Sequence, residues 1–380
     1  MSAPAFEGVF MAVTAAGWLR RPLRALAVVA ALAVVFGAVS APAGAVPPSQ
    51  AERRVTVASY NLYLGANLQP LFAATPATVA TLAQQVWDHM QRVDFLLRAQ
   101  AIARLIDQAD PQVVGLQEVA LWERGGTPGA LAPAVDFLLI LLAALAARGD
   151  RYTAVSVSQN FQSPPVPLAS GGFGRFTDRD VIIARDDLPT SQLKVSNPDD
   201  ARYAASLPLP NPLLAGAPIV RGWASVDVKV RGKSFRVFDT HLEAFSAQVR
   251  TAQAGELAGL LSASPLPVVL VGDLNSQPSD AAGAYGLLTS SVGLADAWVV
   301  VHGPTGGNTS GQTDDLNLPE SLIDHRIDYV LYQPTGLTAV AADVIGEEQG
   351  DRTPPLPGAP FGLWPSDHAG VVATLHLSRP

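Results

Sequence analysis

Short apolar segments that end in polar or ionisable residues recur along this chain, and they constrain its fold more than any other feature. The clearest is VVLVGDLNSQP (268–278), in which an apolar run leads into Gly-Asp-Leu-Asn. If the extended backbone persists, Asp273 and Asn275 project from one face of the strand, because side chains alternate along it. This placement indicates that the two side chains bind something polar.

Other strand-like segments have the same form. Their polar residues are Asn61 in VTVASYN, Glu118 in VVGLQE, His241 in FRVFDTH, Asp328 in RIDYV, and Asp367 with His368 just before GVVATLHL. In α/β architectures ligands bind beyond the strand ends, because side chains leave the packed layers there. Convergence of these segments on one sheet edge would form a pocket rich in oxygen and imidazole groups.

Each of these residues, taken alone, also has an ordinary structural explanation. The alternatives are a turn former for Asn61, a salt-bridge member for Glu118, a core histidine for His241, an internal ion pair with Arg326 for Asp328, and a turn cap for Asp367 with His368. A buried carboxylate needs a partner in either case, because burying it alone is costly. Taken together and in this order, the residues favour a functional site.

The remaining segments predict one domain of mixed α and β structure. Helical spacing of apolar residues marks 81–109, 133–149 and 244–261, and strands begin near 152, 180, 222 and 234, the last two joined as a hairpin across RGK. Pro-, Gly- and Ser-rich loops are expected at 162–175 and 199–218, and a polar loop at 303–320. With no internal repeat and no interdomain linker in the sequence, residues 46–380 are expected to form a single domain.

Residues 1–45 have the features of a secretory signal peptide. Arginines 20, 21 and 24 precede the apolar run 25–39, and small residues follow at Ala43 and Ala45. We therefore expect a secreted protein cleaved near Ala45, with translation starting at Met1 or Met11. These 45 residues carry three arginines and one glutamate, a net +2, so their removal takes the formal charge from −8 to −10.

The composition limits the chemistry further. The chain has no cysteine, so any metal must be held by oxygen or imidazole ligands. An acidic chain does not suit general nucleic-acid coating, which needs a basic surface. Four arginines in or beside the loops, Arg175, Arg179, Arg202 and Arg221, are candidate phosphate contacts.

The motifs resemble those of the exonuclease–endonuclease–phosphatase superfamily, which includes pancreatic-type DNases, abasic-site endonucleases, neutral sphingomyelinases and inositol polyphosphate 5-phosphatases. The resemblance rests on SYNLYLG, LQEV, DTHLEA, GDLNS, RIDYVL and SDHAGV, which run in order through the chain from about residue 55 to 377. It implies an α/β fold of the DNase I type, a four-layer α/β/β/α sandwich with the site at one edge of two packed sheets.

The resemblance also implies a role for each residue. Mg²⁺, with Mn²⁺ or Ca²⁺ as alternatives, would be held mainly by Glu118, with Asn61 and Asp367 completing or orienting its shell. His368, oriented by Asp328, would lie near the scissile phosphate. Asp273 would be a competing general base, and Asn275 would donate to a phosphate oxygen. His241 would be a second acid or phosphate ligand, oriented by Asp180.

The expected function is Mg²⁺-dependent hydrolysis of phosphodiester bonds by a secreted protein. The most favoured activity is that of an endonuclease on nucleic acid. The alternatives are a lipid phosphodiesterase of the sphingomyelinase type, a phosphatase acting on small phosphate esters, and a non-catalytic binding module. Tyr63 stands where several abasic-site nucleases have an acidic or amide residue, which disfavours DNA repair. The substrate would be a nucleic acid or a phospholipid headgroup; no stable protein partner is expected, and the protein would be a monomer.

Overall fold

The computed structural model describes residues 53–209, 211–214 and 218–378 of the 380-residue chain. The expected signal peptide, residues 1–45, lies outside the described residues. Among the residues that are described, no helix is long and apolar enough to cross a membrane.

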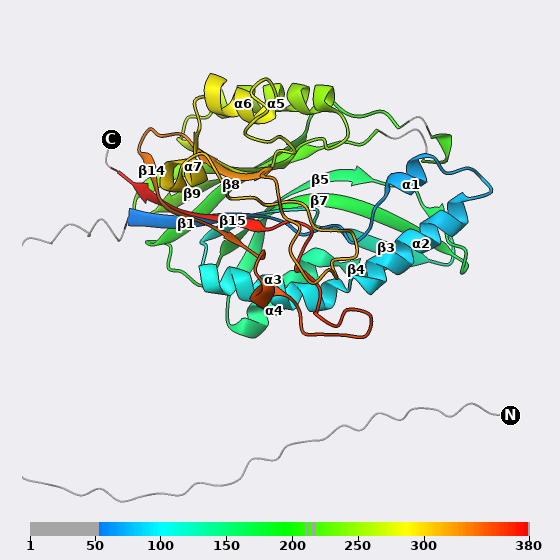
Figure 1. Cartoon of the computed structure of the whole chain (residues 1–380). Helices are drawn as coiled ribbons and strands as arrows, with labels where there is room; N and C mark the ends of the chain where they lie inside the picture. The colour runs from blue at the N-terminus through cyan, green and yellow to red at the C-terminus, as the bar shows by residue number, and fades with distance from the viewer. Residues whose placement is uncertain (1–52, 210, 215–217, 379–380) are drawn as a thin grey trace, which may run out of the picture. The chain divides into compact units, whose positions relative to one another are not determined.

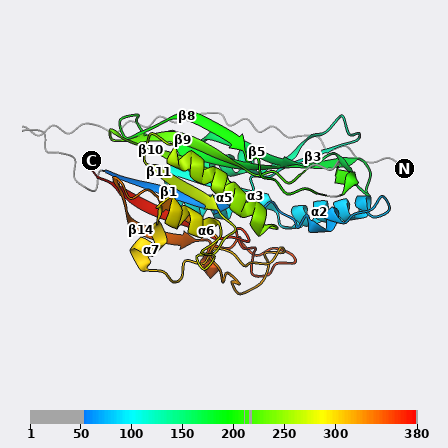
Figure 2. The ribbon, with the colours of Figure 1, turned by 90° about the horizontal axis from the view of Figure 1, so that it is seen from above.

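Two β-sheets form the centre of the fold (Figure 1, Figure 2). The first has the order β14-β15-β1-β2-β7-β3-β4, and β5 and β6 also pair with β7. Its strands are β1 (Arg54–Asn61), β2 (Val113–Gln117), β3 (Leu121–Gly125), β4 (Ala132–Asp136), β5 (Tyr152–Gln162), β6 (Val166–Pro167), β7 (Phe173–Arg185), β14 (Leu337–Ile345) and β15 (Gly370–Leu377). The second has the order β12-β13-β11-β10-β9-β8, with strands β8 (Leu193–Arg202), β9 (Gly222–Val230), β10 (Lys233–His241), β11 (Val268–Asp273), β12 (Ala295–Asp296) and β13 (Asp328–Tyr332).

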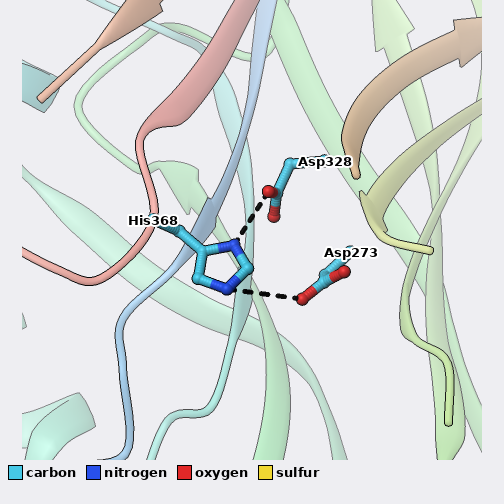
Figure 3. A group of neighbouring side chains, drawn as sticks. All are labelled: Asp273, Asp328 and His368. Carbon is cyan, nitrogen blue, oxygen red and sulfur yellow. Dashed lines mark hydrogen bonds and ion pairs between the residues drawn. The ribbon is translucent and has the colours of Figure 1, made fainter. Parts of the chain in front are cut away.

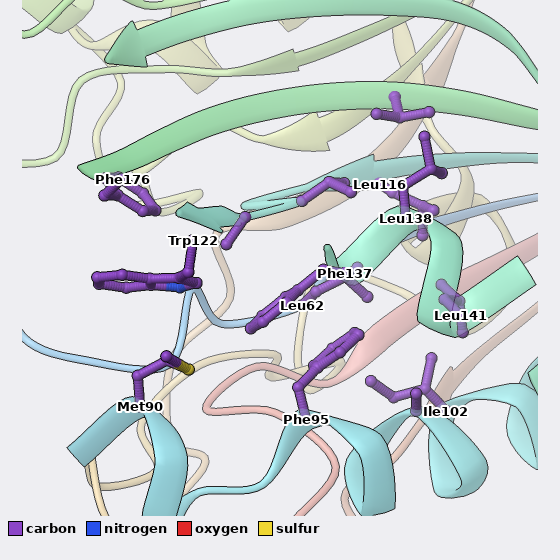
Figure 4. Close-up of a cluster of buried hydrophobic side chains, with 14 of the residues drawn as sticks. Leu62, Met90, Phe95, Ile102, Leu116, Trp122, Phe137, Leu138, Leu141 and Phe176 are labelled. Carbon is purple, nitrogen blue, oxygen red and sulfur yellow. The ribbon is translucent and has the colours of Figure 1, made fainter. Parts of the chain in front are cut away.

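Helices cover the outer face of each sheet. The helices are α1 (Gln69–Phe72), α2 (Val79–Arg92), α3 (Phe95–Ala109) and α4 (Phe137–Arg148) along the first half of the chain, and α5 (Ala247–Ser262), α6 (Ala284–Gly286) and α7 (Ala297–His302) along the second. One apolar core joins α2, α3 and α4 to the first sheet, and Phe95 and Phe137 stack within it at 3.6 Å (Figure 4). A second core lies between the sheets, and a third joins α5 to the second sheet. Three cores separate four layers, so the predicted α/β/β/α sandwich is confirmed.

The central strands are apolar along their whole length because both of their faces are covered. All six residues of β11 are buried, and so are all five of β2. At Gly115 in β2, a Cβ would collide with Val271 of the opposite sheet and with the Asp239 carboxylate. A glycine at this position lets the two sheets approach closely, next to the strand ends that form the site.

Two predicted helices begin or divide at aspartates. The segment 81–109 forms two helices, because Asp94 (φ +29°) interrupts the backbone and its side chain accepts from the Leu97 N–H as an N-cap. The segment 133–149 begins as the strand β4, and its helix starts only after Asp136, which caps the N–H groups of Leu138 and Leu139. Apolar spacing continued across both boundaries, so the spacing alone did not reveal them.

The predicted hairpin is confirmed, and two predicted loops are partly wrong. Within the loop expected at 162–175, β6 spans Val166–Pro167 and β7 begins at Phe173. Val230 pairs with Lys233 across a two-residue turn in which Arg231 and Gly232 both have positive φ, the pattern that suits the strand twist. Residues 199–202, expected in a loop, are the end of β8, which pairs with β9 along the edge of its sheet. This stretch is polar because an edge strand is largely exposed.

Arg98 is a fully buried guanidinium that ties together segments distant in sequence. It donates to the carbonyls of Val93, Leu62, Pro365 and Tyr63 at 2.8–3.1 Å. Burial lowers the pKa of Arg98 to about 10, yet it remains charged at neutral pH. The residue therefore joins the end of β1 and the start of α3 to the loop that leads to the last predicted site residues.

Replacing Arg98 with Met should destabilise the protein by about 3 kcal/mol or more, because several buried carbonyls would lose their donor. Arg151→Met is the matched control: its side chain is 67% exposed and pairs with Asp186, so a change within about 0.5 kcal/mol is expected. Urea unfolding monitored by circular dichroism measures both. Equal effects of the two substitutions would contradict the role given to Arg98.

Candidate active site

The strand ends of both sheets meet at one edge and bring most of the predicted residues into one cleft. Parallel pairing sets Asn61 beside Gln117 in one sheet, and His241 beside Asp273 in the other. Antiparallel pairing sets Asp328 beside Asp273. The cleft has a volume of about 290 Å³, and the predicted residues that line it are Glu118, His241, Asp273, Asn275, Asp367 and His368. Asn61 and Asp328 are buried behind this surface, each hydrogen-bonded to a residue that lines it.

His368 and Asp328 form a buried pair (Figure 3). The Nδ1 of His368 lies 2.8 Å from Oδ2 of Asp328, which is the contact that the resemblance implies. Burial alone would lower the pKa of His368, but Asp328, Asp367 and Asp273 together outweigh it and raise that pKa well above its ordinary value. His368 is therefore a charged donor at neutral pH, with Nε2 facing Asp273 at 3.9 Å. The alternative pair of Asp328 with Arg326 does not form in the described structure, since Arg326 binds Asp296.

Asp273 has the ionisation of a general base. Burial and the neighbouring Asp328 charge raise its pKa to about 7, even though His368, the Asn275 N–H and the Asn61 amide favour the charged form. The Asn61 Nδ2 donates to Asp273 Oδ2 at 3.1 Å, so Asn61 orients this carboxylate across the two sheets. A base whose pKa lies near the working pH combines availability with proton affinity.

Asp273 and Asn275 do not share a face through strand alternation, which corrects the expectation from sequence. β11 ends at Asp273, and Asn275 has φ +48°. The Asn275 N–H donates to Asp273 Oδ1 at 2.8 Å, forming a tight turn of the kind that Asp favours. The turn still keeps both groups at the cleft, since the Asn275 Nδ2 lies 3.0 Å from His241 Nε2 and donates to the Leu242 carbonyl.

Arg221 and Asp178, rather than Asp180, orient His241. Arg221 lies 3.0 Å from His241 Nδ1 and also binds Asp178 Oδ2 at 3.0 Å. The prediction for Asp180 is therefore wrong: Asp180 lies two residues further along β7, fully buried, and accepts from Asn160 at 2.8 Å. Alternation puts Asp178 and Asp180 on one face of the strand, but only Asp178 reaches the cleft.

Both ring nitrogens of His241 face groups that can only donate. Arg221 lies 3.0 Å from Nδ1, and the Asn275 amide nitrogen lies 3.0 Å from Nε2. Burial, Arg221 and His368 lower the pKa of His241 well below its ordinary value, which keeps the ring neutral. A neutral ring accepts at only one nitrogen, so one of the two contacts is not a hydrogen bond. Nε2 also lies 3.4 Å from Asp273 Oδ2, where it faces the cleft.

Three carboxylates, those of Glu118, Asp178 and Asp367, line the part of the cleft best suited to a divalent cation; Asp178 is buried, and the other two are partly exposed. Burial and the charges of Asp367 and Asp178 raise the pKa of Glu118 to about 8, and burial also raises the pKa values of Asp367 and Asp178. Glu118 has φ +55°, and its Oε2 accepts from the Leu64 N–H at 2.7 Å. One oxygen of Asp178 has no hydrogen-bond partner among the described residues. Hard oxygen ligands that repel one another fit Mg²⁺, Mn²⁺ or Ca²⁺.

A second group of potential metal ligands consists of Asp273, Asp328 and His368. One ligand atom from each lies within 4.8 Å of the others, and all three residues are buried. His368 Nδ1 and Asp328 are already joined by a hydrogen bond, so binding a metal there would break that contact. This hydrogen bond favours proton handling by the group, which leaves Glu118, Asp178 and Asp367 as the other carboxylates of the cleft that could hold a metal.

Sequence reasoning assigned the wrong environment to most of the loop arginines. Arg175 binds Glu123, Arg179 binds Asp136, and Arg202 donates to the Gln159 carbonyl. Arg221 alone of the four lines the cleft. Asp178 was missed altogether, although its spacing of two residues from Asp180 was a signal that could have found it.

Replacing Asp328 with Asn should lower the pKa of His368, because the substitution removes the carboxylate charge that raises it and keeps the side-chain shape. Asp107→Asn is the control, since Asp107 pairs with Arg148 on the outer helices. A pH titration of the imidazole signals by NMR, without added metal, measures the shift. An unchanged His368 titration in Asp328→Asn would contradict the electrostatic description.

Comparison with known proteins identifies the family. The model of the Endonuclease/Exonuclease/phosphatase family matches residues 58–368, whereas no curated protein matches the chain. Three similar solved structures are a family protein of Bacteroides thetaiotaomicron (TM-score 0.52, 17% identity, covering 86% of this chain and 98% of that one), a mannosyl-6-phosphatase of the same species (0.52, 20%, 84% and 99%) and the human nocturnin catalytic domain with bound sulfate (0.50, 16%, 86% and 96%). At these identities the likeness shows the fold. The chain belongs to the Endonuclease/Exonuclease/phosphatase family, whose members are hydrolases of phosphate esters.

Proposed function

We propose that this protein hydrolyses phosphodiester bonds with the help of a divalent metal ion. One observation carries the proposal: a single cleft contains the carboxylates of Glu118, Asp178 and Asp367, a carboxylate with a pKa of about 7, and the nitrogen groups of Arg221, His241 and His368. Phosphodiester hydrolysis needs a cation at the phosphoryl oxygens, an activated water and fixed donors for the developing charge. The three parts of the cleft correspond to these three requirements.

The residues divide the work according to their ionisation. Glu118, Asp367 and Asp178 would hold the metal ion, which, when bound, neutralises charge on the phosphoryl oxygens. Asp273 accepts the proton of the attacking water. His368, charged and held by Asp328, donates to a phosphate oxygen, and His241 faces the same phosphate as a neutral ring, while Asn61 and Asn275 keep Asp273 oriented.

The finer proposal is a secreted, monomeric endonuclease that acts on nucleic acid, supported by the resemblance of its motifs to those of nucleases. A second candidate is a phosphodiester that carries an apolar group, because the cleft has an apolar wall formed by Leu68, Phe72, Phe161, Phe176 and Phe245. Hydrolysis of small phosphomonoesters is a third, since a mannosyl-6-phosphatase is among the proteins of similar fold.

The test uses the mature protein, residues 46–380, with Mg²⁺ or with EDTA. Supercoiled plasmid, bis(p-nitrophenyl) phosphate and p-nitrophenyl phosphate separate nuclease, general phosphodiesterase and phosphomonoesterase activities. Metal-dependent nicking supports the nuclease. Hydrolysis of the diester without nicking supports the second candidate, and inactivity on both diesters contradicts the proposed function.

Glu118→Gln and His368→Ala should each lower kcat by about 10²-fold or more while leaving the fold intact, since each removes charge stabilisation specific to the reaction. The matched controls are Glu320→Gln and His302→Ala, which lie outside the cleft and should keep wild-type rates. Steady-state kinetics with the best diester substrate, together with circular dichroism, measure both effects. Near-wild-type activity in either site variant would overturn its assignment.

The pH dependence should report Asp273. Activity is expected to rise with pH as Asp273 loses its proton, because only the carboxylate can accept the proton of water. Asn61→Ala removes a donor that favours the carboxylate, so the acid limb of the kcat/KM profile should move to higher pH. Asn197→Ala, on the edge strand β8, serves as the control with an unchanged profile. A shift to lower pH in Asn61→Ala would show that another group controls the limb.

A further inference from the structure

One wall of the cleft is apolar, and it has two aromatic rings at its mouth. Phe245, four residues beyond the end of β10, is 50% exposed, and its ring meets that of Phe72 edge-on at 5.7 Å and 90°. The Phe245 N–H donates to the Glu243 carboxylate at 2.7 Å, which fixes the turn that presents the ring. An exposed aromatic ring held rigidly beside His241 is suited to contact with a ligand.

A narrow apolar slot continues from this wall into the protein. The slot and the cleft share Leu68, Phe72, Phe161 and Phe176. Deeper residues of the slot are Leu71, Val86, Trp87, Trp122 and Leu168. A group attached to a phosphate on the cleft floor therefore has a continuous apolar surface on which to lie.

The charges of the cleft disfavour a polyanion along this wall. Of the described residues that line the cleft, Arg221 is the only arginine or lysine, and it is buried against Asp178. Five carboxylates line the same cleft: Glu118, Asp178, Asp273, Asp314 and Asp367. One metal-bound phosphoryl group fits this balance, whereas flanking phosphates would have no cation to neutralise them.

The size of the slot decides between a ring and a chain. Its volume is about 50 Å³, compared with roughly 30 Å³ for one water in the liquid and about 150 Å³ for a protein cavity that binds benzene. A nucleobase or other ring would remain outside at Phe245, while the end of an alkyl chain can enter. The small volume of the slot thus favours the end of a hydrocarbon chain over a ring.

From this wall and slot we infer that the site takes a phosphodiester with a hydrocarbon chain, which lies along Phe245 and Phe72 and ends in the slot. This inference rests on the proposed phosphodiester hydrolysis, and it favours the second candidate substrate over nucleic acid. Phe245 is then a specificity-determining residue, and burial of each methylene against the wall adds to the binding of substrate and transition state.

The test keeps the leaving group constant and varies the chain. Methyl and hexyl esters of p-nitrophenyl phosphate are compared with Mg²⁺ present, and wild-type kcat/KM should be at least tenfold higher for the hexyl ester. Phe245→Ala should reduce the ratio below threefold, mainly through KM, and Phe245→Leu should largely restore it. Leu139→Ala removes an apolar residue from α4 that is 64% exposed and lies outside the cleft, and this variant should keep the wild-type ratio.

A binding measurement separates this inference from the proposed function. Hexyl phosphate and methyl phosphate are titrated into the Mg²⁺-loaded protein by calorimetry, with the same variants. At least tenfold tighter binding of hexyl phosphate, lost in Phe245→Ala, supports the chain site even in a protein without turnover. Equal binding of the two ligands by the wild type, or a preference for hexyl phosphate that Phe245→Ala leaves intact, overturns the inference.

Discussion

The crowding of carboxylates in one cleft is the constraint on which the site depends. Glu118, Asp178 and Asp367 line the cleft at a junction of two packed sheets, and desolvation raises the pKa of each. Such an arrangement is costly unless protons, fixed donors or a cation offset it. The protein supplies fixed donors, among them Arg221 and the Leu64 N–H. In the proposed function, a divalent ion would offset the negative charge that remains.

The same low-polarity surroundings give each histidine a different state. His368 is surrounded by carboxylates and becomes charged, while His241 faces a guanidinium and remains neutral. Both rings present Nε2 toward Asp273, at 3.9 Å and 3.4 Å. The Asp273 carboxylate therefore lies between a charged imidazole and a neutral one, and its own pKa is about 7. The surroundings of each histidine, rather than its residue type, determine whether its ring is charged.

The sequence predicted the architecture and most of the cleft because strand ends carry readable signals. Apolar runs that end in Asn61, Glu118, His241 or Asp273 identify side chains that leave the packed layers. It could not show that Asn275 adopts a left-handed conformation or that Asp94 divides a helix, since apolar spacing is silent about single backbone angles. Nor could it distinguish Asp178 from Asp180, because strand alternation gives the face of a side chain but not its depth between the sheets. Arg221, which contacts His241, lies in a different segment from Asp178 and Asp180, and only the tertiary structure places it beside the histidine.

The hydrogen bond from Asn61 to Asp273 has a mechanical consequence, because it crosses from one sheet to the other. The site is assembled from strand ends of both sheets, so the stacking of the sheets aligns its two halves. Gly115 permits the close stacking, with Val271 filling the space where a side chain would be. Small changes of side-chain volume between the two sheets would therefore shift the site residues of one sheet relative to those of the other. The interior of this protein therefore sets the alignment of its site, and the inter-sheet core tolerates less variation than its apolar composition suggests.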